Sequence, residues 1–384
     1  MNNSDCTITC LNCDKSRPKV LMITPFHKQN RGNGVTASRI RSGMEALGWN
    51  IDLCSLDERD NIPRLRREAV AMDYGLIHGF HALHLGNLLN EIQELKKLPI
   101  LLTMTGTDLN SLRSDKLVDR ITEVLDIAAA IVVFNADDVS FLSRVCPDWG
   151  KKTTLIPQGV AVGDGTPTLR TADEDRSSTQ QDQVGDGTPT QRTAALSRAA
   201  LGLSVNEIVF IIPSGLRAIK NIEMAVDAIN AVINRGKKAG LIIAGPVIER
   251  EYAARLLSRI NHNPAIKYLG EIEHSGMKPL YSLADVVVNS SYSEGQPQAA
   301  LEAMSLGKPC ILTAVPGNLN IIEDYREGIY VRNTEELAAA MDYFINDPQQ
   351  LTTMGLAAQE LIMNKFTVNS EINAYHSLYK QINN

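Results

Sequence analysis

The sequence lacks a long hydrophobic run and an excess of basic residues. No apolar stretch in the 384 residues reaches the roughly 20 residues of a membrane-spanning helix, and the N-terminus lacks the apolar segment of a secretory signal. The formal net charge of -6 argues against nucleic acid as a partner. We therefore expect a soluble, cytoplasmic protein. Weak peripheral contact with a membrane stays open because of the basic stretch that begins at Arg64.

Cysteine is also scarce, with six residues in the chain. Cys54, Cys146 and Cys310 are scattered in or near apolar segments, which fits a reducing compartment. The other three, Cys6, Cys10 and Cys13, have a C-x3-C-x2-C spacing that can hold an iron–sulfur cluster. They lie in a short polar tail, residues 1–17, with no barrel pattern behind it. We interpret this tail as disordered, and we expect no bound metal and no cofactor.

Short β-rich runs alternate with amphipathic stretches of helical period in both halves of the chain. Runs such as KVLMIT from Lys19 and GLIIAGP from Gly240 are apolar at nearly every position, which is typical of parallel strands covered on both faces. The alternation predicts right-handed βαβ units. We therefore expect an α/β protein with two doubly wound, Rossmann-like domains, at residues 18–160 and 196–367, that face a central cleft. A last helix, within residues 368–384, can return to the first domain.

A repeat separates the two halves. VGDGTPTLRTA at Val162 recurs as VGDGTPTQRTA at Val184, and the segment has hardly any large apolar side chain. Such a composition cannot offset the entropy of ordering. We interpret residues 161–195 as a disordered, duplicated insertion at the linker.

In each half of the chain, a turn follows the first strand. In the first, Gly32 and Gly34 flank Asn33 ahead of a helix that Thr36 can cap, an arrangement that suits a phosphate and equally suits a plain turn. In the second, PSGLRAIKN places Arg217 and Lys220 just after the turn at Gly215. Two cations there suit a diphosphate, although helix-start cations are common on surfaces.

The segment SEGQPQAALEAMSLGKPC, from Ser293, contains two glutamates eight positions apart. Pro297 suits a first helical turn and Gly307 suits a helix end, so we predict a helix from about Gln298 to Leu306. Glu294 then lies in the loop before the helix and Glu302 inside it. Spacing alone allows a catalytic pair, a sugar clamp or a polar helix start.

These motifs together resemble a known family. EGQPQAALEAMSLGKPCI is similar to the E-x7-E signature of GT-B glycosyltransferases of family four, and SGLRAIKN, IIAGP, YLGEI and IPQGV resemble other segments of that family. GNGVTASRI, TGTDLN, VVNSSYSEG and VPGN resemble the glycosyltransferase 1 domain-containing subgroup, and the first two also resemble selenosugar synthases. The resemblance implies a GT-B fold and transfer of a sugar from a nucleotide-diphosphate sugar, such as a UDP-sugar, to an unidentified acceptor.

The resemblance also implies roles for individual residues. Arg217 and Lys220 would neutralise the leaving diphosphate, and Glu294 would hold hydroxyls of the donor sugar. Glu302 would hold the ribose, with no metal required and with retention of the anomeric configuration. Further donor contacts are implied for the turns and loops around these residues: Gly32, Asn33, Gly215, Ile272, Gly295 and Gln296.

One position departs from the family pattern. Many members have a histidine where this chain has Thr105. Asp108 is a candidate to orient the acceptor or take its proton, and it could equally cap the following helix. His78, His81 and His84 resemble a cleft-facing histidine of many members, but each could also be structural.

Other functions remain open at this stage. A sugar-nucleotide epimerase, a phosphorylase and a nonenzymatic sugar-nucleotide binder could use the same two-domain cleft. Within the transferases, transfer to a selenium or sulfur nucleophile competes with transfer to a hydroxyl. Nothing in the first half of the chain decides between these acceptors.

Overall fold

The computed structural model describes residues 17–25, 32–58, 61–71, 74–114, 118–161 and 197–383. The polar tail up to residue 16 and the duplicated insertion at residues 162–196 lie outside these ranges, so the interpretations of both stay predictions. The chain divides into two compact units, one of Met1–Gly159 with Val368–Asn384 and one of Val160–Thr367. Each unit is described by itself.

The first unit is built on a six-stranded sheet. Its strands are β1 (Lys19–Thr24), β2 (Ile51–Ser55), β3 (Tyr74–Phe80), β4 (Ile100–Thr103), β5 (Ala130–Val133) and β6 (Thr153–Leu155). Its helices are α1 (Gly32–Ala46), α2 (Asn61–Ala71), α3 (Ala82–Glu91), η1 (Gln93–Lys97), α4 (Thr107–Arg113), α5 (Val118–Ile127), α6 (Ala136–Val145), α7 (Pro147–Lys151) and α15 (Val368–Asn383).

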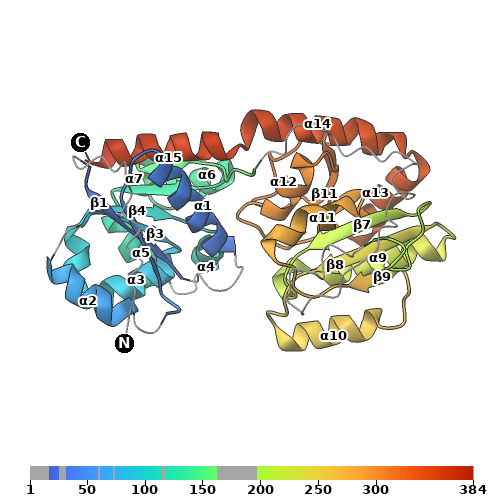
Figure 1. Cartoon of the computed structure of the whole chain (residues 1–384), viewed down its shortest axis with the longest axis horizontal. Coiled ribbons are helices and arrows are strands. Elements are labelled where there is room, and N and C mark those ends of the chain that lie inside the picture. Colours follow the sequence, from blue (N-terminus) through green and yellow to red (C-terminus); the bar gives the residue numbers. More distant parts are fainter. Residues whose placement is uncertain are drawn as a thin grey trace, which may run out of the picture. The chain divides into compact units, whose positions relative to one another are not determined.

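All strands of this sheet are parallel, in the order β2-β1-β3-β4-β5-β6. One apolar cluster covers the face beneath α3 and α5, and another covers the face beneath α1 and α15 (Figure 1). Burial of both faces explains why these strands are apolar at nearly every position. The chain leaves β1 and β3 toward opposite edges, so the sheet has its topological switch point between these two strands.

The C-terminal helix α15 packs on α1 of this first unit. Tyr375 and Tyr379 are fully buried in the cluster beneath the two helices. A Cβ added at Gly43 would lie 2.5 Å from Ile372, so the small residue allows the close approach. Arg39 of α1 binds both carboxylate oxygens of Glu371, at 2.7 and 3.0 Å.

The second unit repeats the plan. Its strands are β7 (Ile208–Pro213), β8 (Ala239–Ala244), β9 (Ile266–Tyr268), β10 (Val286–Asn289), β11 (Cys310–Thr313) and β12 (Gly328–Val331). Its helices are η3 (Ala218–Lys220), α9 (Ile222–Asn234), α10 (Arg250–Ile260), η4 (His274–Gly276), α11 (Met277–Ser282), α12 (Gln298–Ser305), α13 (Thr334–Asn346) and α14 (Gln349–Lys365).

This second sheet is also fully parallel, in the order β12-β11-β10-β7-β8-β9. Its two apolar clusters lie on opposite faces, one with α9, α10 and α13 and the other with α11, α12 and α14 (Figure 1). The switch point lies between β7 and β10, because the chain continues from them toward opposite edges. Ligands of doubly wound sheets bind beyond the carboxyl ends of the strands at such a point. The predicted pair of Rossmann-like domains is confirmed.

One local expectation was wrong. The helix after β1 begins at Gly32, so Gly32, Asn33 and Gly34 form its first turn rather than a turn before it. Thr36 lies inside the helix and is no cap. Its hydroxyl is buried and donates to Gln158 Oε1 at 2.7 Å, a contact that holds α1 against the end of the first unit's main segment.

Within the described ranges, the helices are all too short or too polar to cross a lipid bilayer.

The Arg39–Glu371 pair gives a stability prediction for the first unit. The Glu371 side chain has no solvent exposure, so Glu371→Ala leaves Arg39 without its partner and should cost about 3 kcal/mol of unfolding free energy. Both tryptophans, Trp49 and Trp149, lie in this unit, so their fluorescence during urea unfolding reports it.

Glu91→Ala serves as the control for this variant. Glu91 forms an exposed pair with Arg66, whose removal should cost less than about 1 kcal/mol. Equal losses from the two variants would contradict the structural role given to Glu371.

Candidate active site

Two loops meet at the switch point of the second sheet. The loop after β7 passes through Gly215 and forms the short helix η3, which ends at Lys220. The loop after β10 contacts it twice: Ser290 Oγ donates to the Lys220 carbonyl at 3.0 Å, and the Tyr292 amide donates to the Ile219 carbonyl at 2.9 Å. These bonds fix the two loops side by side, although about seventy residues separate them in the chain.

Lys220 and Glu294 form an ion pair between these loops. Lys220 Nζ lies 2.5 Å from Glu294 Oε1, and the two side chains are 16% and 10% exposed. The same oxygen accepts hydrogen bonds from Ser291 Oγ at 2.6 Å and from Asn289 Nδ2 at 3.0 Å. Three donors therefore hold Oε1, while the described residues provide no hydrogen bond to Oε2.

These contacts keep Glu294 ionised. Burial acts to raise the pKa of its carboxyl group, but the charge of Lys220 and the hydrogen bonds from Lys220, Ser291 and Asn289 outweigh burial. The net result is a pKa below the ordinary value. At neutral pH, Glu294 is a carboxylate with one anchored oxygen and one oxygen left for a ligand.

The loop after β11 presses against the backbone of Glu294. The Glu294 amide donates to the Pro316 carbonyl at 3.3 Å. Gly317 has φ of +88°, and a Cβ there would overlap the Glu294 carbonyl oxygen. Only glycine meets both conditions, because other residues disfavour positive φ and carry a side chain.

Glu302 lies on α12, as predicted. The helix begins at Gln298 after Pro297, and Gly307 follows its end with φ of +72°. Tyr281 of α11 donates its hydroxyl to Glu302 Oε2 at 3.0 Å. Burial and the nearby carboxylate raise the pKa of Tyr281 well above its ordinary value, so this hydroxyl keeps its proton. Glu294 and Glu302 are thus held by different neighbours, one in a loop and one in a helix.

The remaining predicted residues of this unit lie in loops that follow its strands β7, β9 and β10. A Cβ at Gly215 would lie 2.5 Å from Ile248, so the turn packs closely against the loop after β8. Arg217 is half-buried, and its Nε is buried with no hydrogen-bond partner among the described residues. Gly295 and the buried Gln296 join Glu294 to α12. Ile272 lies in the loop after β9 and packs against the core beneath α11 and α12.

In the first unit, Asp108 is completely buried and bonded to backbone amides. Its carboxylate accepts from the amides of Ala82 at 2.9 Å, Thr105 at 3.0 Å and Leu109 at 3.1 Å. Ala82 begins α3, so Asp108 caps that helix from a distant part of the chain. The expectation that Asp108 caps the helix after it was wrong, because Asp108 lies inside α4 (Thr107–Arg113) and bonds to the start of α3 instead. Its role in taking a proton from the acceptor stays a prediction.

The histidines of the first unit have different surroundings. His78 is structural: its two ring nitrogens contact the hydroxyls of Tyr379 at 2.7 Å and Thr103 at 2.8 Å, and burial lowers its pKa to about 3. His81 directly follows the carboxyl end of β3 and has φ of 72°. Its Nε2 contacts Thr107 at 3.0 Å, and its buried Nδ1 has no partner among the described residues.

Asn33 lies in the first turn of α1, which follows the carboxyl end of β1. Its amide donates to the hydroxyl of Thr105 at 3.3 Å, so it contacts the residue that replaces the family's usual histidine. Among the described residues, no atom lies within 4 Å of a Cβ added at Gly32.

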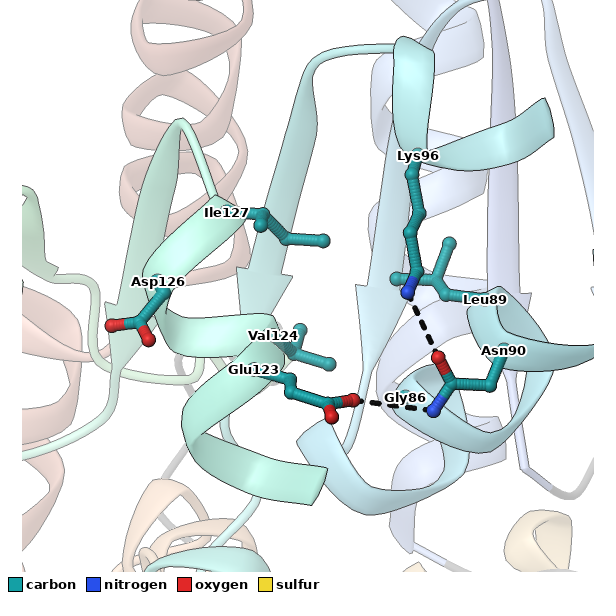
Figure 2. Close-up of a pocket in the computed structure, with 8 residues that line it drawn as sticks. All are labelled: Gly86, Leu89, Asn90, Lys96, Glu123, Val124, Asp126 and Ile127. Atoms are coloured by element: carbon teal, nitrogen blue, oxygen red, sulfur yellow. Dashed lines mark hydrogen bonds between the residues drawn. The ribbon is translucent and has the colours of Figure 1, made fainter. Parts of the chain in front are cut away.

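A groove of about 210 Å³ lies between α3 and α5 of the first unit. Lys96 donates to Asn90 Oδ1 at 2.8 Å, and Asn90 donates to Glu123 at 3.2 Å across it (Figure 2). A Cβ at Gly86 would lie 2.9 Å from the Arg120 carbonyl, so the two helices approach closely here. Lys96, Asn90 and Glu123 bond to one another, and the groove contains none of the predicted site residues.

In the described part of the chain, no group of three or more His, Cys, Asp or Glu side chains is arranged to hold a metal ion.

The fold is shared with a known class of proteins. Two Rossmann-like units are the architecture of GT-B glycosyltransferases, and the second carries acidic and basic groups at its switch point. HepE of Anabaena, solved in complex with UDP and glucose, superposes with a TM-score of 0.72 and 15% identity over 95% of this chain and 100% of that chain.

Sequence comparisons point the same way. Residues 206–347 match the family described as Glycosyl transferases group 1. An uncharacterised glycosyltransferase of Methanocaldococcus jannaschii is 31% identical over 39% of this chain and 39% of its own length. Glycosyltransferase 1 domain-containing protein 1 of Xenopus tropicalis is 22% identical over 44% of this chain and 49% of its own length. The matches span less than half of these relatives. The predicted resemblance to group 1 glycosyltransferases is confirmed.

Gly317 provides a test of how the loops are packed. Gly317→Ala should lose about 3 kcal/mol or more of stability, because the methyl group adds overlap with Glu294 to the strain of positive φ. Gly236→Ala is the matched control: Gly236 has φ of +79° and no atom of the described residues within 4 Å of an added Cβ, so this variant should lose only about 1 kcal/mol. The difference between the two variants in unfolding free energy, measured with urea, gives the cost of the overlap with Glu294. Equal losses of stability would contradict the close approach of Gly317 to Glu294.

The lowered pKa of Glu294 predicts a pH dependence. A lowered folded pKa stabilises the protein above the unfolded value, near 4.5, and this stabilisation is lost as pH falls through the folded pKa. Glu294→Gln, which cannot ionise, should be about 3 kcal/mol less stable than the unmodified chain between about pH 5 and 7. This difference in unfolding free energy between the variant and the unmodified chain should decrease below about pH 4.5. Urea unfolding followed by circular dichroism checks this, and a gap independent of pH would contradict the charge pairing.

Proposed function

We propose that this chain is a glycosyltransferase that transfers a sugar from a nucleotide-diphosphate sugar, a UDP-sugar, to an acceptor nucleophile. The observation that carries the proposal is the Lys220–Glu294 pair at the switch point of the second sheet, with one carboxylate oxygen held and the other left for a ligand. The family match over residues 206–347 and the fold shared with a UDP-binding protein support it.

The diphosphate of the donor would contact Arg217 and Lys220. In the reaction, the bond between the anomeric carbon and the β-phosphate oxygen breaks, and its electron pair stays on the nucleoside diphosphate. The two cations stabilise this growing negative charge. Arg217 suits the task because its guanidinium can bind two oxygens, and its buried Nε has no partner among the described residues. Lys220 has two further N–H donors beyond the one used by Glu294.

The sugar and the ribose would each be held by one carboxylate. Glu294 Oε2 accepts hydroxyl hydrogen bonds of the donor sugar, and Glu302 accepts those of the ribose from α12. Ile272 lies beside the base, and the amides of Gly295 and Gln296 approach the phosphates near the N-terminus of α12. The acceptor nucleophile bonds to the anomeric carbon, and its proton passes to the departing diphosphate or to water. The anomeric configuration is retained, and the charge of Arg217 and Lys220 makes a metal ion unnecessary.

Calorimetry with UDP-, GDP- and ADP-sugars tests this function. A UDP-sugar should bind, and Glu302→Ala should weaken it about tenfold or more by removing charge-assisted hydrogen bonds. Glu360→Ala, which removes an exposed glutamate of α14, is the control and should bind as the unmodified chain does. Excess EDTA should leave binding and turnover unchanged.

Two results would reject the proposal. One is that none of these nucleotide sugars binds, and the other is that Glu302→Ala binds the donor as well as the control does. The configuration of the product, read from its anomeric proton coupling, tests retention separately.

A further inference from the structure

A buried polar network lies behind Glu294. It consists of Asn289, Ser291, Thr313 and Asn318. We propose that Asn318 is a positioning residue, which acts through Asn289 to hold Glu294 Oε1 and so leave Oε2 directed at the donor sugar. The inference deepens the proposed function and rests on it for the identity of the ligand.

Asn318 has no solvent exposure, so it cannot contact a ligand itself. Its Nδ2 lies 3.1 Å from Asn289 Oδ1, 3.0 Å from the Thr313 carbonyl and 3.2 Å from Thr313 Oγ1. All three atoms can accept a hydrogen bond, because Thr313 Oγ1 donates its own proton to the Ser291 carbonyl at 2.7 Å. The amino side of the Asn318 amide therefore faces its acceptors, and this fixes the orientation of the amide.

The orientation of Asn318 determines that of Asn289. Asn289 Oδ1 accepts from Asn318 Nδ2 and from the Ser291 amide at 3.2 Å. With its oxygen held in this way, Asn289 directs Nδ2 at Glu294 Oε1, 3.0 Å away. An inverted Asn289 would place its oxygen against the carboxylate and repel it.

Burial of the Asn318 side chain costs free energy, and its own packing does not explain why this cost is tolerated. Its Oδ1 is buried without a hydrogen-bond partner among the described residues. A buried acceptor without a partner loses its hydration without compensation, and each case calls for an explanation. The orientation of Asn289, and through it of Glu294, provides one. The neighbouring Gly317 already presses on the Glu294 backbone, so one loop sets both the backbone and the carboxylate of this residue.

A double-mutant cycle tests this route. Asn318→Ala should weaken the binding of UDP-glucose or UDP-N-acetylglucosamine, whichever the unmodified chain binds better, about tenfold. Binding of UDP alone should change less than about twofold, because UDP lacks the sugar that Glu294 holds. In an Asn289→Ala background, Asn318→Ala should add less than about twofold.

The control is Asn263→Ala. Asn263 is a half-buried asparagine of the second unit that lies after α10 and donates to Asn230 at 2.7 Å. It should leave both affinities unchanged. If Asn318→Ala weakens UDP and the UDP-sugar equally, or if the two losses add in the double variant, the positioning role is overturned. Weakening of the UDP-sugar by Glu294→Gln but not by Asn318→Ala would reject this inference and leave the proposed function standing.

A ligand-free measurement decides the inference even if no donor binds. Lys220 is the charged group that contacts Glu294, and it is intact in every variant compared. The Glu294 carboxyl carbon, followed by carbon-13 NMR during an acid titration, should titrate at a higher pH in Asn318→Ala, because a donor to the carboxylate is no longer held in place. A titration equal to that of Asn263→Ala would overturn the inference. Failure of nucleotide binding with a shifted titration would reject the proposed function alone.

Discussion

The ion pair between Lys220 and Glu294 is the constraint on which the second unit's site depends. Both side chains are largely removed from water, where an isolated charge is costly, and the charge of Lys220 helps to lower the pKa of Glu294 against the effect of burial. The pair can form only because β7 and β10 are neighbours in the sheet while their connections run to opposite edges. The Ser290 and Tyr292 hydrogen bonds then hold the two loops at the spacing that the pair requires.

The surrounding polar groups give the two oxygens of Glu294 different roles. Lys220, Asn289 and Ser291 all bond to Oε1, which lowers the freedom of the carboxylate without occupying Oε2. A buried polar network of this kind is useful only if its donors and acceptors are matched, because unmatched groups lose their hydration without compensation. Tyr281 performs a similar task for Glu302 with a hydroxyl that keeps its proton. The site is thus preorganised by side chains that bond to one another.

The sequence was sufficient to predict strands and helices that have a clear apolar pattern. It was not sufficient where tertiary contacts determine the local structure or the role of a residue. The buried parallel strands were predicted, but β12 was not, because it begins with glycine and only Ile329 and Val331 supply buried apolar side chains. Gly32 and Asn33 indicated a turn, yet burial of Gly34 and the Thr36–Gln158 hydrogen bond favour helix there. Family resemblance pointed to Lys220 and Glu294. It could not show that Asn318 supports Asn289, or that Asp108 caps a helix 26 residues earlier, because these contacts exist only in the fold.

In the proposed reaction, Lys220 has a double role that follows from its contacts. An ammonium group has three donors, and Glu294 uses one of them, so the others can bind the diphosphate while the carboxylate holds the sugar. Arg217 and Lys220 contribute two positive charges and Glu294 removes one, which leaves the site only partly matched to a diphosphate. As the glycosidic bond breaks, the charge on the phosphate grows, and Lys220 is drawn more strongly to it than to the carboxylate. Because Lys220 contacts both the carboxylate that binds the sugar and the diphosphate that leaves, binding of the sugar is coupled to stabilisation of the leaving group. A neutral residue at position 220 could not provide this coupling.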